Sequence, residues 1–206
     1  MGLNNNENTS VVLYIHGVDG NVSEADHFKE FFPHCDVIAI DYKSIMPWET
    51  GREIKEKVSE LKEKYKKVIL IANSIGAFFA MDAEITEDIR RAYFISPIVD
   101  MEALILDMMS AANISEADLK EAGTIKTESG QVLSWEYLSY VRSRELSWRV
   151  PTEVLYGSED KYTSFDVIKR FAVNHGCSLT VMKDGEHWFH TEEQMQFLDG
   201  WIRKFY

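Results

Sequence analysis

The chain has 206 residues, of which 45% are hydrophobic and 27% are charged, an ordinary composition for one soluble globular domain. Its net charge of −12 argues against nucleic acid or an anionic membrane as the main partner, because both attract basic surfaces. No apolar run approaches the ~18 residues that span a bilayer, and the N-terminus lacks a secretory signal pattern, so we expect a cytoplasmic protein.

Residues 1–9 are polar and are expected to form a disordered leader, and residues 10–206 to form a single domain. Six short runs rich in β-branched residues follow, separated by amphipathic segments. Their near-continuous apolar character predicts strands that are buried on both faces, as in a parallel sheet. The alternation of strand and helix predicts an α/β fold, a three-layer sandwich around a mainly parallel sheet of about six strands. The predicted strands cover residues 11–15, 37–41, 68–72, 92–96, 152–156 and 178–182.

The first predicted strand ends in His16 and Gly17, which lead through Val18 into a loop. A glycine at this point lets the backbone approach a ligand closely. A strand that ends in His-Gly is common, so this motif gains weight only beside the other segments described below.

The third predicted strand ends in Ala72-Asn73-Ser74-Ile75-Gly76. Small residues two positions before and after a serine are what the sharp strand-to-helix turn of a nucleophile elbow requires. Acyl transfer through a serine also needs two fixed N–H donors for the oxyanion that forms. The N–H of Ile75, at a helix N-terminus, and the N–H of Val18 are the candidates.

The alternation of strand and helix is interrupted over about residues 98–150, where no strand is predicted and residues 123–130 are expected as a loop. Apolar residues at helical spacing predict a helix over residues 101–112. Ser115 and Ser134 can cap a second and a third helix. We expect a small helical cap insertion over one end of the sheet, and the alternative is that one of these helices is the ordinary crossover.

A carboxylate and a histidine follow the last two predicted strands. Asp160 lies just beyond the fifth strand, where a carboxylate can orient an imidazole and stabilise its cation, and the adjacent Glu159 is an alternative. His187 lies in a short loop after the sixth strand, from which a base could reach back across the strand ends. His190 competes with it, but lies beside the capping box Thr191-x-x-Gln194 of a final predicted helix.

The remaining candidates for chemistry are isolated. Cys35 and Cys177 lie far apart and outside any metal-ligand spacing, so we expect free thiols in a reducing compartment. His27, His34 and His175 have no partner pattern. No metal or organic cofactor is indicated.

The order serine, acid, histidine, with each residue at the C-terminal end of a predicted strand, resembles that of the α/β-hydrolase superfamily. Ala72 departs from the glycine usual at its position, a mild departure because the constraint is on size. The resemblance covers nearly the whole chain from Val11, and the chain resembles the compact members, in which the first two of the usual eight strands are missing. Its specific parts are His16-Gly17, Ala72-Asn73-Ser74-Ile75-Gly76, Gly157-Ser158-Glu159-Asp160 and Gly185-Glu186-His187.

The resemblance implies a catalytic triad of Ser74, Asp160 and His187. It also implies that the oxyanion hole is made by the backbone N–H groups of Val18 and Ile75. Asp100, just after the fourth predicted strand, stands near a position that some relatives use for the acid. It is therefore the alternative to Asp160.

The resemblance further implies a serine hydrolase, of the carboxylesterase type, that cleaves a carboxylic ester or related acyl bond of a small molecule through an acyl-enzyme on Ser74. The alternatives are a peptidase, thioesterase or acyltransferase on the same triad, or a non-catalytic binding protein of this fold. Apolar cap residues that face the site would favour an apolar or aromatic acyl group. The candidate substrate contacts are His16, Gly17, Asn73, Trp188, Met108 and Trp135.

Overall fold

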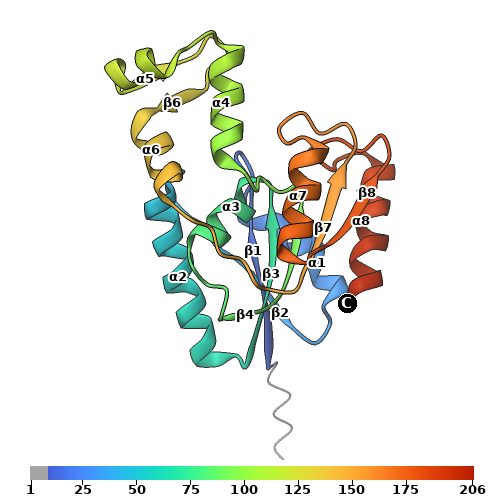
Figure 1. Ribbon diagram of the computed structural model, residues 1–206. Helices are drawn as coiled ribbons and strands as arrows, with labels where there is room; N and C mark the ends of the chain where they lie inside the picture. Colours follow the sequence, from blue (N-terminus) through green and yellow to red (C-terminus); the bar gives the residue numbers. More distant parts are fainter. Residues whose placement is uncertain (1–8) are drawn as a thin grey trace, which may run out of the picture.

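A computed structural model describes residues 9–206 as a six-stranded sheet covered by helices on both faces (Figure 1). The strand order is β2-β1-β3-β4-β7-β8, and every neighbouring pair in this sheet is parallel, which confirms the predicted fold class. The predicted leader lies outside the described residues except for Thr9, whose carbonyl accepts the N–H of Lys66 at 2.9 Å. The strands are β1 (Ser10–Ile15), β2 (Asp36–Ala39), β3 (Lys67–Asn73), β4 (Ile89–Ile95), β7 (Thr152–Gly157) and β8 (Ser178–Met182).

The sheet is buried on both faces because its strands are apolar at nearly every position. In β1, Val11, Leu13 and Ile15 belong to one core, and Val12 and Tyr14 to the other. The first core packs against α2 (Pro47–Lys64), α3 (Ile75–Asp82) and α7 (Phe165–His175). The second packs against α1 (Ala25–Phe28) and α8 (Glu192–Phe205), and two 3-10 turns, η1 (Val22–Glu24) and η2 (Lys29–Phe31), flank α1.

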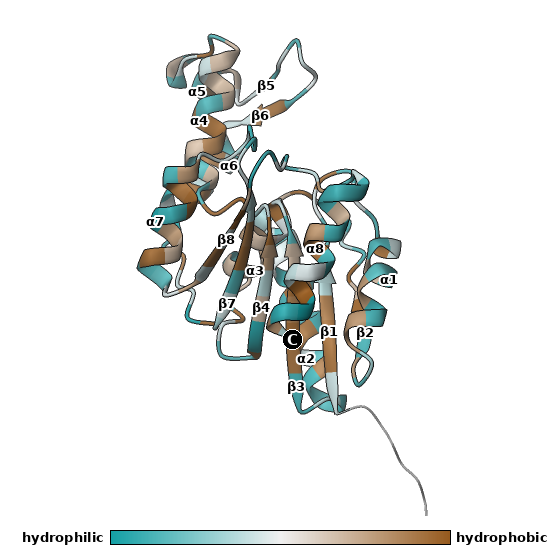
Figure 2. Cartoon of the chain, turned by 90° about the vertical axis from the view of Figure 1, so that its right-hand side faces the viewer, coloured by the Kyte–Doolittle hydropathy of each residue, from teal (hydrophilic) through white to brown (hydrophobic). Residues whose placement is uncertain are grey.

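Figure 2 shows that hydrophobic residues gather on the strands, whereas α7 and α8 carry hydrophilic stretches. None of the helices that the structure describes is both long enough and apolar enough to cross a bilayer.

The final helix begins where the sequence predicts, but the predicted capping box forms only on one side. The Thr191 hydroxyl accepts the N–H of Gln194 at 3.2 Å. The Gln194 side chain does not return to Thr191; its Oε1 accepts the N–H of His190 at 3.1 Å. The loop that carries His187 is therefore tied to the first turn of α8.

The cap is inserted in the sequence between β4 and β7, and it lies beyond the C-terminal ends of the strands (Figure 1). The prediction that it contains no strand is wrong. Residues 124–134 form an antiparallel hairpin in which Ile125 is opposite Leu133 and Gly130 takes a positive φ of 91°. Strands of three residues are too short to produce a detectable alternation. The cap elements are α4 (Met101–Ala111), α5 (Glu116–Ala122), β5 (Thr124–Lys126), β6 (Val132–Ser134) and α6 (Trp135–Ser143).

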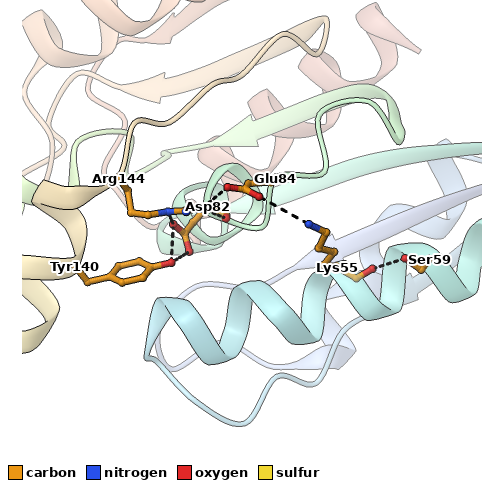
Figure 3. A network of polar contacts seen from close by, with 6 residues as sticks. All are labelled: Lys55, Ser59, Asp82, Glu84, Tyr140 and Arg144. Carbon is orange, nitrogen blue, oxygen red and sulfur yellow. Dashed lines mark hydrogen bonds and ion pairs between the residues drawn. The ribbon is translucent and has the colours of Figure 1, made fainter.

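A polar cluster joins the end of the cap to the body of the protein (Figure 3). Asp82, at the end of α3, has a side chain that is only 1% exposed. Its carboxylate accepts the Nε–H of Arg144 at 3.1 Å and the hydroxyl of Tyr140 at 2.9 Å. Arg144 also donates to Glu84 at 2.8 Å. Burial and the hydrogen bond to Asp82 raise the pKa of Tyr140 to about 12.

We expect Asp82→Ala to lower the free energy of unfolding by about 1–3 kcal/mol, because two donors lose a buried charged acceptor. The range allows for the partial exposure of Arg144. Chemical denaturation measures the change. The matched control is Lys55→Ala, which removes an exposed ion pair to Glu84 at 3.8 Å and should change stability by less than about 0.5 kcal/mol. Equal effects of the two variants would contradict this account of the cluster.

Candidate active site

The serine at the end of β3 occupies a strained turn. Ser74 has a φ of 53° and a ψ of −123°, in the positive-φ region that favours glycine, and α3 begins at the next residue. A serine held in this way, between strand and helix, is the geometry of a nucleophile elbow. Gly76 makes the turn possible because α3 lies directly against β1. A Cβ atom at Gly76 would lie 2.6 Å from the carbonyl oxygen of Ile15 and 2.8 Å from that of His16.

Gly76→Ala should therefore destabilise the protein by about 1–3 kcal/mol, since backbone atoms of β1 would have to move. The matched control is Gly200→Ala in α8, where an added Cβ has no atom within 4 Å. Alanine is the better helix former, so the control should stabilise by up to about 1 kcal/mol. Thermal unfolding of the two variants tests this, and a neutral Gly76→Ala would show that the turn tolerates a side chain.

The structure brings the three predicted triad residues together from segments far apart in the chain. Ser74 Oγ lies 2.8 Å from His187 Nε2, and His187 Nδ1 lies 2.7 Å from Asp160 Oδ2. The Asp160 side chain is fully buried and that of His187 is 16% exposed. The other carboxylate oxygen of Asp160 accepts the N–H groups of Tyr162 at 2.8 Å and Thr163 at 3.2 Å. The carboxylate is thus fixed on both oxygens, and the imidazole is held between acid and hydroxyl.

Two glycines let the loops that carry the acid and the histidine meet. A Cβ at Gly157 would lie 2.4 Å from the carbonyl oxygen of Gly185, so the loops after β7 and β8 touch through their backbones. The N–H of Glu159 donates to that same Gly185 oxygen at 2.8 Å. Ser158 adds a side-chain contact by accepting the N–H of Asp184 at 2.8 Å. Asp160 and His187 are therefore placed relative to each other by direct loop-to-loop contacts.

The loop after β1 lies beside Ser74. A Cβ at Gly17 would approach Ser74 Cβ to 3.0 Å and Ser74 Oγ to 3.6 Å. The Tyr42 hydroxyl donates to the carbonyl oxygens of His16 and Gly17 at 3.1 and 3.3 Å, and its ring stacks on His16 at 4.3 Å. This loop therefore places Gly17, the residue before Val18, beside Ser74. Ile75 is the first residue of α3, where N–H groups have no acceptor within the helix.

The alternative site residues lie elsewhere. Asp100 caps α4, where its side chain accepts the N–H of Ala103 at 3.0 Å, and it lies 3.5 Å from Arg170. His190 turns its Nδ1 to the carbonyl oxygen of Trp188 at 2.7 Å. The residue that contacts His187 is thus Asp160.

The residues predicted to contact substrate differ in how exposed they are. Trp188 is 68% exposed and stacks on His190 at 4.4 Å. His16 is buried against Tyr42. Met108 and Trp135 are partly buried and pack on the first core, as cap side chains at helical spacing often do. Asn73 is half-buried, and burial together with the hydrogen bond that the Tyr14 hydroxyl donates to Glu24 raises the pKa of the nearby Tyr14.

Sequence reasoning missed two aromatic residues of the site, Tyr42 and Tyr162. Tyr162 lies against His187 with 4.7 Å between ring centroids, and 51% of its surface is exposed. Tyr162 is two residues after Asp160, which was the available signal. Tyr42 had none, since its contact with residues 16 and 17 arises only when β2 pairs with β1.

No sequence family profile and no curated protein matches the chain. Among solved structures, Est1E from Butyrivibrio proteoclasticus has a TM-score of 0.76 at 17% identity over 98% of this chain and 88% of that one. Alpha/beta hydrolase domain-containing protein 10 from mouse has a TM-score of 0.67 at 15% identity, covering 95% and 90%. The Pyrococcus furiosus esterase Pf2001 has a TM-score of 0.63 at 18% identity, covering 97% and 81%. The chain therefore has the α/β-hydrolase fold.

Proposed function

We propose that the protein is a serine hydrolase that cleaves a carboxylic ester of a small molecule through an acyl-enzyme on Ser74. The observation that carries the proposal is the unbroken hydrogen-bonded series Ser74, His187, Asp160, with the Gly17 loop packed against Ser74. The fold itself does not fix a function, and the proposal rests on the site.

In the proposed reaction, His187 Nε2 takes the proton of Ser74 as the Ser74 Oγ attacks the ester carbonyl carbon. The carbonyl oxygen becomes an oxyanion, which the N–H groups of Val18 and Ile75 stabilise. The C–O bond to the alcohol breaks, and His187 returns its proton to the departing oxygen. Water then repeats the sequence on the acyl-enzyme and releases the acid. Asp160 holds the imidazole in the required tautomer and stabilises its cation.

The test is turnover of p-nitrophenyl esters of graded acyl length by the purified protein. An aromatic acid ester belongs in the series, because Est1E, which is similar in fold, has also been solved with ferulic acid bound. The proposal expects turnover of at least one ester with an initial burst of p-nitrophenol when deacylation is slow. Failure to hydrolyse any ester, amide or thioester would contradict the proposal. Hydrolysis of only an amide or only a thioester would instead identify the protein as a peptidase or a thioesterase.

A further inference from the structure

The direction of proton transfer defines where the leaving group of an ester must lie. The departing oxygen receives its proton from His187 Nε2 and so must come within hydrogen-bond distance of that atom. The carbonyl oxygen points the other way, toward the N–H groups of Val18 and Ile75. Side chains that touch the His187 ring and remain open to solvent therefore border the alcohol part of the substrate.

Tyr162 fits this description. Its ring contacts the His187 ring with 4.7 Å between centroids and 57° between planes, yet 51% of the residue is exposed. The backbone that carries the ring is held in place, since the N–H of Tyr162 donates to Asp160 Oδ1 at 2.8 Å. A large aromatic surface is thus held beside the candidate base without being covered by the protein. Trp188, directly after His187 in the chain and 68% exposed, adds apolar surface at the same loop.

We propose that Tyr162 determines specificity for the alcohol part of the ester and selects a flat, apolar alcohol, such as a benzyl-type group. This inference rests on the proposed function. The exposed ring offers an edge or a face to an aromatic leaving group, the arrangements in which aromatic pairs attract each other. The acyl part of the ester is attached to Ser74 and lies away from Tyr162. The preference for the alcohol should therefore not depend on the length of the acyl chain.

The experiment compares the benzyl and ethyl esters of one acid. Both esters form the same acyl-enzyme, so only acylation, read as kcat/KM, reports the alcohol. Both alcohols are simple primary alcohols, which keeps differences in intrinsic leaving ability small. The wild type should prefer the benzyl ester. Tyr162→Ala should lower the ratio of the two kcat/KM values by about 3- to 10-fold, the factor that an aromatic pair contributes.

Two matched variants isolate the effect. Tyr162→Phe keeps the ring and should keep the ratio. Phe165→Ala removes an aromatic residue that is 45% exposed but contacts Tyr156 rather than His187, and it should also keep the ratio. When deacylation limits turnover, kcat should be the same for the two esters in every variant.

The outcomes separate the inference from the proposed function. Hydrolysis with an unchanged ratio in Tyr162→Ala would overturn the inference alone, including when both rates fall equally, because general disturbance of His187 cancels in the ratio. A wild-type preference for the ethyl ester would overturn it as well. No hydrolysis of either ester, together with no covalent labelling of Ser74, would overturn the proposed function and the inference with it.

Discussion

Ser74→Ala should lower kcat/KM for every ester substrate by about 10⁴- to 10⁶-fold, the loss seen when one member of a catalytic triad is removed. Without the hydroxyl, His187 has no nucleophile to activate and no acyl-enzyme can form. Steady-state kinetics on the best ester of the graded series measures the loss. Alanine is also small enough for the elbow, so circular dichroism and thermal unfolding should show a folded protein.

His187→Ala should cost about as much as Ser74→Ala, and the double variant little more than either alone, because the two residues act as a unit. Additive losses would mean that the two side chains contribute separately. A Ser74→Ala protein that retained a tenth of its activity would show that hydrolysis takes place at another site.

The second large effect is expected at Asp160. Asp160→Asn should lower kcat by about 10³- to 10⁴-fold, as in triads in which the acid is replaced by its amide. The asparagine oxygen can still accept the N–H groups of Tyr162 and Thr163. Its NH₂ group then faces His187 Nδ1, and a donor at that position favours the imidazole tautomer that protonates Nε2. Such an imidazole cannot take the proton of Ser74.

The matched control is Asp100→Asn. Asp100 caps α4, and asparagine caps helices as well as aspartate does, so stability should be preserved. Activity should also be preserved, because the carboxylate that contacts His187 belongs to Asp160. The reverse result, with activity lost in Asp100→Asn and kept in Asp160→Asn, would show that the acid has been assigned to the wrong residue.

The sheet and the order of the site segments could be predicted from the sequence because both depend on local patterns. Strands buried on both faces are nearly continuous apolar runs, and all six were found within a few residues of their ends. Parallel strands bring their C-terminal ends to one edge, which places Ser74, Asp160 and His187 in the same region. The small residues around Ser74 indicate a close approach of the backbone, and the structure shows that approach at Gly76, where an added Cβ would collide with β1.

The parts that could not be predicted depend on contacts between distant segments. Tyr42 reaches residues 16 and 17 only through strand pairing, and Arg144 reaches Asp82 only when the cap folds back on α3. The strands β5 and β6 have three residues each, which is too few for an alternating hydrophobic pattern to be recognised in the sequence. Substrate contact by Met108 and Trp135 stays a prediction, because the apolar stripe of a cap helix looks the same whether it lines a pocket or packs on a core.

The central claim is that Ser74 is a nucleophile activated by His187. It is tested most directly by labelling the folded protein with a fluorophosphonate probe and locating the adduct by peptide mass spectrometry. The account predicts one adduct, on Ser74, which is absent in Ser74→Ala, strongly slowed in His187→Ala and formed at the wild-type rate in Asp100→Asn. A wild-type protein that is folded but acquires no adduct on Ser74 would contradict it.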